Sequence, residues 1–328
     1  MNRYIVTGGA GFIGSALVRA LQAQGHGVDI IDDLSTGSLD NLEEIADQVT
    51  VHEYDIRDYK RIAPVIAGAR RVFHLAALPS VPKSILNPVG SHESNIDGTF
   101  NVLRASAEGK VGRLVYAASS SAYGDTEVLP KVETMAPRPK SPYAVQKLTG
   151  EYYAAAFAEC LGLETVSLRF FNVFGPRQDP TSVYSGVLSI FLTCLIERRS
   201  PTIYGDGNQS RDFTYVEDVV GLLLKAAEAP AHVSGKVFNA GNGNRYTLNE
   251  TWELLQKIAG VHLPANYGPP RPGDVRDSQA DTSAAVRELG HKPQFTFEQG
   301  LRLTLDWYHA DSARKQGGSV RSGATLVS

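Results

Sequence analysis

The 328 residues carry 32 Lys and Arg against 35 Asp and Glu, which gives a formal net charge of −3. This balance gives no reason to expect a nucleic-acid or anionic-membrane partner. The two cysteines, Cys160 and Cys194, lack the spacing of metal ligands, so neither a disulfide nor a metal site is expected. The chain has no run of about 20 apolar residues that could span a membrane, and its first residues lack the apolar core of a signal peptide. We therefore expect a cytoplasmic protein.

The first half of the chain alternates short apolar runs with longer amphipathic segments. The short runs predict β-strands at 4–6, 28–31, 49–54, 71–76, 113–119 and 164–170. The longer segments predict helices at 12–24, 41–47, 58–67, 89–109 and 143–161. Apolar strands separated by helices are typical of a parallel sheet covered on both faces. The predicted fold is α/β, a Rossmann doubly wound parallel sheet.

After about residue 176 the chain becomes rich in loops with Gly, Pro and Arg. A helix within 213–228 and a strand within 236–241 still predict that the chain returns to the sheet. The last stretch, 311–328, has few apolar anchors and predicts a disordered tail.

Two domains are expected from this pattern. A dinucleotide-binding domain takes 1–176 plus about 211–248, and a smaller, discontinuous α/β domain takes about 177–210 and 249–310.

The chain opens with a strand, a glycine turn and a helix in "YIVTGGAGFIGSALVRAL". The missing side chains of Gly8, Gly11 and Gly14 allow a tight turn, backbone approach to a pyrophosphate, and close packing of the helix on the strand. Asp32 ends the second strand, where a carboxylate accepts hydrogen bonds from the adenosine ribose and repels a 2′-phosphate. The motif predicts a bound dinucleotide, and NAD rather than NADP. The alternative is a structural turn without a ligand.

Two further segments follow strands of the predicted sheet. Asp55 and Ile56 come after the third strand and suit the edge and face of an adenine ring. "HLAAL" (74–78) supplies small residues where a strand end would pass beneath the dinucleotide. His74 is a candidate base, although a histidine within a strand more often belongs to the core.

The segments "AASSSAYGD" and "SPYAVQK" carry the residues with the clearest chemistry. Tyr143 and Lys147 lie one helical turn apart, so their polar ends share one face. Ser119 ends a strand, and ligands of doubly wound sheets bind beyond the carboxyl ends of the strands. A lysine ammonium and a positive nicotinamide ring would lower the pKa of the phenol from about 10. The three residues predict base chemistry on an alcohol, coupled to hydride loss to NAD.

The Ser–Tyr–Lys spacing, with "TGGAGFIG", "RFFNVFGP", "GDGNQSRDFTYVEDV" and "RPGDVRDS", resembles the extended short-chain dehydrogenases/reductases over about residues 1–308. "AALPSVPKSILNP" and "AASSSAYGD" are most similar to bacterial UDP-hexose 4-epimerases that prefer UDP-N-acetylglucosamine or its uronic acid. The resemblance implies that tightly held NAD oxidises C4 of the sugar to a ketone, that the keto sugar rotates, and that the hydride returns to the other face. It also implies a role in polysaccharide biosynthesis and a homodimer that packs through helices 89–109 and 143–161.

The motifs and the resemblance together assign the site residues. Tyr143 is the base and acid, Lys147 its electrostatic partner and a ribose ligand, and Ser119 the hydroxyl clamp. The residues assigned to the cofactor are Gly8, Gly11, Phe12, Ile13, Gly14, Asp32, Asp33, Leu34, Ser35, Thr36, Gly37, Asp55, Ile56, Leu75, Ala76, Ala77, Asn95, Tyr143, Lys147 and Phe171. Those assigned to the UDP-sugar are Ser80, Lys83, Ser84, Ser119, Ser120, Tyr143, Asn172, Val187, Leu188, Thr202, Tyr204, Arg211, Arg271, Asp274 and Ser278.

Two of these positions bear on the identity of the sugar. Ser278 stands where relatives restricted to non-acetylated sugars carry a tyrosine, and its small side chain leaves room for a 2-acetamido group. UDP-N-acetylglucosamine and UDP-N-acetylgalactosamine are therefore favoured, with UDP-glucose and UDP-galactose also accommodated. Lys83 could favour a 6-carboxylate, which keeps a UDP-hexuronic acid open, or it could be a solvated loop lysine.

Other activities of the same family are less consistent with the sequence. A 4,6-dehydratase carries a Thr-Asp-Glu run where this chain has Ser119, Ser120 and Ser121, and a UDP-glucuronate decarboxylase carries a glutamate there. The missing carboxylate disfavours both. A 4-keto reductase using NADPH is disfavoured by Asp32. A non-catalytic NAD-binding sensor, from a different class, is disfavoured because Tyr143 and Lys147 are both present.

Overall fold

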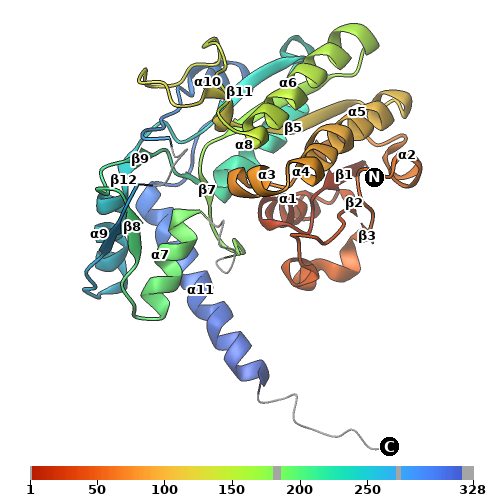
Figure 1. Ribbon diagram of the computed structural model, residues 1–328. Helices are drawn as coiled ribbons and strands as arrows, with labels where there is room; N and C mark the ends of the chain where they lie inside the picture. The colour runs from red at the N-terminus through yellow and green to blue at the C-terminus, as the bar shows by residue number, and fades with distance from the viewer. Residues whose placement is uncertain (1, 180–185, 271–274, 320–328) are drawn as a thin grey trace, which may run out of the picture.

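The computed structural model describes residues 2–179, 186–270 and 275–319 (Figure 1). Its main sheet is seven-stranded in this part of the chain, parallel throughout, in the order β11-β6-β5-β4-β1-β2-β3. The strands are β1 (Arg3–Thr7), β2 (Gly27–Ile31), β3 (Thr50–His52), β4 (Arg71–His74), β5 (Arg113–Ser119), β6 (Thr165–Phe170) and β11 (Lys236–Ala240). The predicted doubly wound α/β fold is confirmed, including the return of the chain to the sheet as β11, beside β6.

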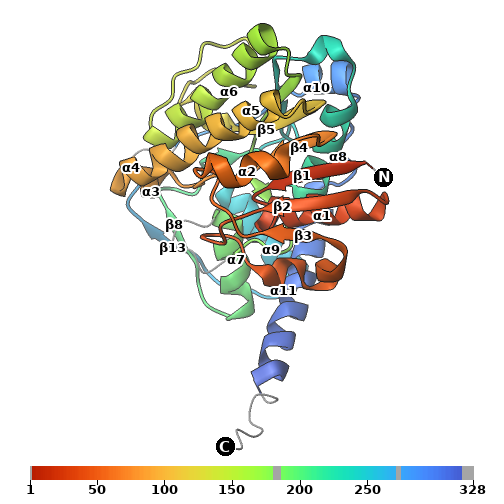
Figure 2. The same cartoon turned by 90° about the vertical axis from the view of Figure 1, so that its right-hand side faces the viewer.

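Helices cover both faces of this sheet because its central strands are apolar on both sides. One face packs against α1 (Phe12–Ala23), η1 (Leu39–Gln48), α8 (Val216–Glu228) and α10 (Ser283–Leu289). The other face packs against α2 (Tyr59–Ile66), α5 (Gly98–Glu108) and α6 (Pro142–Leu161). Figure 2 shows α5 and α6 lying side by side on this second face.

The predicted helix over 89–109 is in fact three consecutive pieces. It comprises α4 (Pro88–His92), a π-helical turn η2 (Glu93–Asp97) and α5, and it is preceded by α3 (Val81–Leu86). The remaining short elements near the sheet are η3 (Ser120–Tyr123) and η4 (Ala231–Val233). The π-turn widens the helix by one residue, a deviation that apolar periodicity does not reveal.

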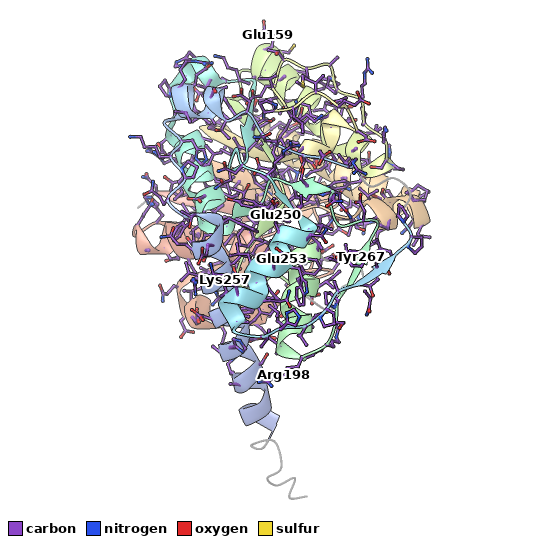
Figure 3. All side chains as sticks on the ribbon, turned by 90° about the vertical axis from the view of Figure 1, so that its left-hand side faces the viewer. Glu159, Arg198, Glu250, Glu253, Lys257 and Tyr267 are labelled. Carbon is purple, nitrogen blue, oxygen red and sulfur yellow. The ribbon has the colours of Figure 1, made fainter. Side chains whose placement is uncertain are left out.

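A separate apolar core lies beside the sheet. It is built by α7 (Val187–Ile196), α9 (Leu248–Ala259) and α11 (Phe297–Ser319). The short strand pairs here are β7 (Val173–Phe174) with β10 (Thr214–Tyr215), β9 (Ser210–Arg211) with β12 (Tyr246–Thr247), and β8 (Thr202–Tyr204) with β13 (Asn266–Gly268). Figure 3 shows Glu250, Glu253 and Lys257 on the outer face of α9, opposite the buried Trp252 and Leu255.

Two features depart from the expected domain boundaries. Helix α10 falls within the range expected for the smaller domain, yet its Ala285 and Leu289 join the core of the main sheet. Helix α11 continues to Ser319 and extends away from the body in Figure 1. Residues 311–319, which the sequence analysis places in the disordered tail, prolong this helix, whose first turns are anchored by Leu301 and Leu305. Residues 320–328 lie outside the described chain.

Among the described residues, no helix has the length and apolar composition needed to cross a membrane.

Candidate active site

The glycine turn between β1 and α1 brings backbone, without side chains, to the carboxyl end of the sheet. Gly8 has φ +72°, and a Cβ there would lie 2.7 Å from the backbone nitrogen of Ala76. A Cβ on Gly14 would lie 2.0 Å from the carbonyl oxygen of Gly8, so glycine is required for the helix to pack on the turn. Helix α1 begins at Phe12 with no acidic residue in its first turn. This turn suits a pyrophosphate, since free N–H groups and the positive end of the helix dipole face the same place.

Asp32 lies at the end of β2, against the glycine turn. Its carboxylate accepts hydrogen bonds from the backbone N–H groups of Ala10 and Leu34, both at 2.9 Å. Burial raises the pKa of Asp32, and these two hydrogen bonds oppose that rise. The carboxylate is thereby fixed in orientation and keeps lone pairs that can accept from ribose hydroxyls. The residues present thus fit the adenosine half of NAD.

One large cavity of about 1360 Å³ connects this turn to the Ser–Tyr–Lys residues and to the loops of the second half. Its volume is ample for a dinucleotide and a second ligand, because single drug-sized ligands fill pockets of about 300–1,000 Å³. The predicted site residues that line it are Gly8, Gly11, Phe12, Ile13, Gly14, Asp32, Asp33, Ser35, Thr36, Gly37, Ile56, Leu75, Ala76, Ala77, Ser80, Lys83, Ser119, Ser120, Tyr143, Lys147, Phe171, Asn172, Arg211 and Ser278. The structure therefore brings most of the predicted site together.

Tyr143 is positioned by the first turn of α6. Ser141 caps this helix by accepting from the backbone N–H of Ala144 at 3.2 Å, and Pro142 opens it. The backbone N–H of Tyr143 donates to the Ser84 hydroxyl at 3.1 Å, which ties the helix start to α3. The phenol also interacts with the hydroxyl of Ser119, at the end of β5. Ser119 in turn accepts from the Ser121 hydroxyl at 2.8 Å.

Burial dominates the electrostatics of the Tyr143–Lys147 pair. It raises the pKa of Tyr143, and the hydrogen bond with Ser119 only partly offsets that rise. It also lowers the pKa of Lys147 to about 7, against the opposing effect of the Glu151 carboxylate. In the chain alone the phenol is therefore harder to ionise than in water. This differs from the lowered pKa expected from the sequence, because desolvation of the buried phenol outweighs the hydrogen bond with Ser119.

His74 is a core residue. It is fully buried between the Thr7 hydroxyl, 2.7 Å from Nδ1, and the Thr99 hydroxyl, 3.0 Å from Nε2. Burial lowers its pKa to about 3. A ring with both nitrogens engaged is not placed to take a proton from a substrate.

Several residues predicted for the cofactor lie outside the cavity lining. Asn95 accepts from the backbone N–H of Leu78 at 2.8 Å and donates to Gln146 at 2.9 Å, so it joins the loop after β4 to α6. Asp55 is paired with Arg57. Leu34 packs against the core of the main sheet. These contacts are structural, and a binding role for the three residues stays a prediction.

Some of the residues predicted to bind the UDP-sugar also lie outside the cavity lining. Leu188 is buried in the core of α7, and Val187 packs against that core. Thr202 and Tyr204 lie on β8, which pairs with β13 away from the lining. The hydroxyl of Ser84 accepts the hydrogen bond from the backbone N–H of Tyr143, as described above. Arg271 and Asp274 lie outside the described residues.

Some residues of the site were not predicted. Tyr123, Lys131 and Gln178 line the cavity. The Lys131 ammonium donates to Thr126 and, at 2.9 Å, to the carbonyl oxygen of Val128. Tyr123 ends the short helix η3, and Lys131 and Gln178 lie in loops without a periodic pattern, so only the folded chain shows that the three meet at the cavity.

Glu151 and Arg169 form a buried ion pair behind Lys147. A signal for both was present in the sequence. Glu151 follows Lys147 by one further helical turn, and Arg169 is the one charged residue of β6.

Comparison with known proteins places the chain in a family. Residues 4–241 match the family model described as the NAD dependent epimerase/dehydratase family. The chain belongs to this family. Its sequence is 36% identical to a UDP-glucose 4-epimerase of Mycolicibacterium smegmatis, over 94% of this chain and 99% of that protein.

Solved structures of the family agree with the fold. A UDP-glucose 4-epimerase of Thermotoga maritima with UDP-glucose has a TM-score of 0.90 and 37% identity, over 94% of this chain and 99% of that one. A UDP-N-acetylglucosamine 4-epimerase of Methanobrevibacter ruminantium in complex with UDP-N-acetylmuramic acid has a TM-score of 0.90 and 36% identity, with the same coverage. NAD dependence is a property of the family, and the glycine turn and Asp32 are consistent with it.

The role of Asp32 can be tested by Asp32→Ser. Loss of a charged hydrogen-bond acceptor is expected to weaken NAD binding by about tenfold to a hundredfold and to reduce discrimination against NADP, since the repelling carboxylate is gone. The measurement is the amount of dinucleotide released from the denatured, purified protein, followed by titration of NAD and NADP. Asp47→Ser, at an exposed aspartate of η1, is the control. Equal NAD content in both variants would contradict the assignment.

Proposed function

We propose that this protein catalyses the reversible C4 epimerisation of a UDP-hexose with bound NAD, and that UDP-N-acetylglucosamine and UDP-N-acetylgalactosamine are its favoured pair. The observation that carries this proposal is the convergence of Ser119, Tyr143 and Lys147 on the wall that they share with the glycine turn. A hydroxyl, a phenol and an ammonium there suit removal and return of a proton on a sugar alcohol. The segment Ser119–Ser121 itself lines the cavity with hydroxyls and carries no carboxylate, which favours epimerisation over elimination of water.

NAD, held by the glycine turn and Asp32, would supply the hydride acceptor, and then the hydride donor, that this chemistry needs. Tyr143 takes the proton of the 4-hydroxyl in the first half of the reaction and returns it in the second. Ser119 holds that same oxygen through its hydroxyl, which the bond with Ser121 orients. Lys147, in its charged form, stabilises the phenolate of Tyr143 in surroundings from which water is excluded.

The far end of the cavity suits the nucleotide diphosphate. Asn172 donates through Nδ2 to the carbonyl oxygen of Asp212 at 3.1 Å and to the hydroxyl of Ser278 at 3.2 Å. Arg211 donates to the carbonyl oxygens of Ser210 and Arg276, at 3.0 and 2.9 Å. These contacts hold an amide and a guanidinium at the cavity wall, where a fork of N–H donors can meet paired phosphate oxygens.

A product assay tests the proposed function. Purified protein is incubated without added NAD with UDP-N-acetylglucosamine, UDP-glucose and UDP-glucuronic acid in separate reactions, and the configuration at C4 is read by proton NMR. A galacto-configured product from UDP-N-acetylglucosamine, formed faster than from UDP-glucose, is expected. No epimer from any of the three, even after NAD is supplied, would overturn the proposal and leave the NAD-binding sensor in its place.

A UDP-hexuronic acid is the second candidate substrate. Lys83, next to the cap of α3, lines the same cavity as Ser80 and Tyr143. An ammonium there could pair with a 6-carboxylate, in which case UDP-glucuronic acid is the fastest of the three substrates and Lys83→Met removes that preference. The assignment of 1–176 plus about 211–248 to NAD, and of about 177–210 and 249–310 to the sugar nucleotide, is part of the proposal, as is a cytoplasmic location.

We also propose a homodimer that packs through α5 and α6. Val145 and Tyr152 on α6 and Phe100 on α5 are large apolar side chains exposed at 47%, 61% and 38%. Phe100 stacks edge-to-face on the half-exposed Tyr153, with ring centroids 5.4 Å apart, which makes the apolar surface continuous across the two helices. Two such helices from each subunit could bury this surface as a four-helix bundle.

The dimer is tested by Tyr152→Arg. An arginine within this apolar surface is expected to convert the dimer into a monomer, because its charge would be buried without a partner. The mass in solution is measured by analytical ultracentrifugation. Leu39→Arg, at an exposed apolar side chain of η1, should leave the mass unchanged. A wild-type monomer would sink the proposed interface.

A further inference from the structure

A buried charge cluster lies directly behind the Tyr143–Lys147 pair. Lys147 is 4% exposed, Glu151 2% and Arg169 3%. Side chains so far from water are screened weakly, so each charge acts strongly on its neighbours. The cluster extends from α6 to β6, at the base of the cavity.

Glu151 pairs with Arg169 and also acts electrostatically on Lys147. It follows Lys147 by one turn of α6, which places the two side chains on one face of the helix. Its carboxylate accepts from Arg169 in a bidentate arrangement: Nε at 3.0 and 3.2 Å, and Nη2 at 2.7 Å. Arg169 also lies over the ring of Tyr123, 4.5 Å from its centroid, and its Nη1 has no hydrogen-bond partner among the described residues.

An ion pair buried this deeply contributes little to the stability of the fold. Removing two charges from water costs several kcal/mol per ion, which their attraction only repays in part. The unpartnered Nη1 of Arg169 adds to that cost. A cost of this kind at the base of an active site points to a functional role for the pair.

The other groups that face Lys147 carry no charge. His74 on β4 is neutral, since burial lowers its pKa to about 3. Tyr116 on β5 has its ring centroid 4.7 Å from the Lys147 ammonium, and burial raises its pKa well above 10. Tyr143 on α6 is neutral in the chain alone, because burial raises its pKa. Glu151, held by Arg169, is therefore the anion that the described elements around Lys147 supply.

We infer that Glu151 is a positioning residue that keeps Lys147 in its charged form, and that Arg169 keeps Glu151 ionised for that purpose. Burial alone favours a neutral lysine and a protonated glutamate. The Glu151 carboxylate opposes the loss of charge on Lys147, and the Arg169 guanidinium opposes the protonation of Glu151. This inference rests on the proposed function, in which the charged lysine stabilises the phenolate of Tyr143.

The inference predicts how removal of each charge changes the pH profile. Glu151→Gln leaves the Arg169 charge unbalanced beside Lys147, so the alkaline limit of kcat is expected to move to lower pH by about one unit or more, and kcat at neutral pH to fall about tenfold or more. The KM for the UDP-sugar should hardly change. Glu151→Gln combined with Arg169→Met removes both charges, so its alkaline limit should lie between those of Glu151→Gln and the wild type. Glu151→Asp restores the carboxylate and should restore the limit.

A direct titration separates this inference from the proposed function. The titration midpoint of Lys147 is measured by NMR of labelled lysine side chains in the full-length protein, and its signal is identified by its absence from Lys147→Met. The midpoint should be lowest in Glu151→Gln, higher in the double variant, and highest in the wild type and Glu151→Asp. A purely structural role would lower the melting temperature of the variants and leave the midpoints equal, which would overturn the inference. A wild-type protein without epimerase activity would overturn the proposed function instead, and the titration would still decide the role of Glu151.

Discussion

Tyr143→Phe is expected to lower kcat by about 10²- to 10⁴-fold while NAD stays bound. The substitution removes one oxygen and keeps the ring, so the buried packing of the first turn of α6 is preserved. The backbone hydrogen bond from Tyr143 to Ser84 is unaffected. What is lost is the group that takes the proton from the substrate and returns it. The kinetics are measured with each UDP-sugar, and the NAD content of the purified variant is measured in parallel.

Tyr153→Phe provides the matched control for this variant. Tyr153 lies on the same helix, but its ring contacts Phe100 at the surface rather than the cavity. Its turnover should equal that of the wild type. Near-wild-type turnover by Tyr143→Phe would remove the phenol from the mechanism and end the catalytic assignment.

Ser278→Tyr is expected to lower kcat/KM for UDP-N-acetylglucosamine by roughly a hundredfold relative to that for UDP-glucose. Ser278 lines the cavity and lies against Asn172. A tyrosine ring there would occupy the space that we assign to the 2-acetamido group, and a clash of this kind acts on one substrate and spares the other. The experiment compares initial rates for both sugars across the variant series.

Ser278→Ala is the necessary control, because the serine also makes contacts of its own. Its hydroxyl accepts from Asn172 at 3.2 Å and from the backbone N–H of Asp212 at 3.3 Å. Loss of these bonds loosens Asn172 and should weaken turnover of both substrates alike. If Ser278→Ala and Ser278→Tyr shift the two substrates by the same ratio, the serine does not set specificity through its size.

The elements that the sequence predicts well are those whose signal is local. The glycine turn, the strand ending at Ser119 and the helix that starts at Pro142 each follow from residues within one short segment. The main sheet follows from the alternation of apolar strands and helices, and β11 returns to it as predicted.

The features that the sequence does not predict depend on contacts between distant segments. Asn95, which the sequence assigns to the cofactor, lies in the π-helical turn η2 and bonds to Leu78 and Gln146, contacts that its own segment does not reveal; its cofactor role stays a prediction. Lys131 reaches the cavity because its backbone pairs with Gln279, far along the chain. The raised pKa of Tyr143 depends on how much of the folded chain covers it, which spacing does not reveal.

The central claim is that C4 loses a hydride and regains the same one. UDP-glucose and UDP-N-acetylglucosamine carrying deuterium at C4 test it most directly, with the product examined by NMR and mass spectrometry. The account predicts full retention of deuterium at C4 in the galacto-configured product, because the hydride never exchanges with water. Replacement of that deuterium by solvent hydrogen would contradict it and point to removal of the C4 hydrogen as a proton.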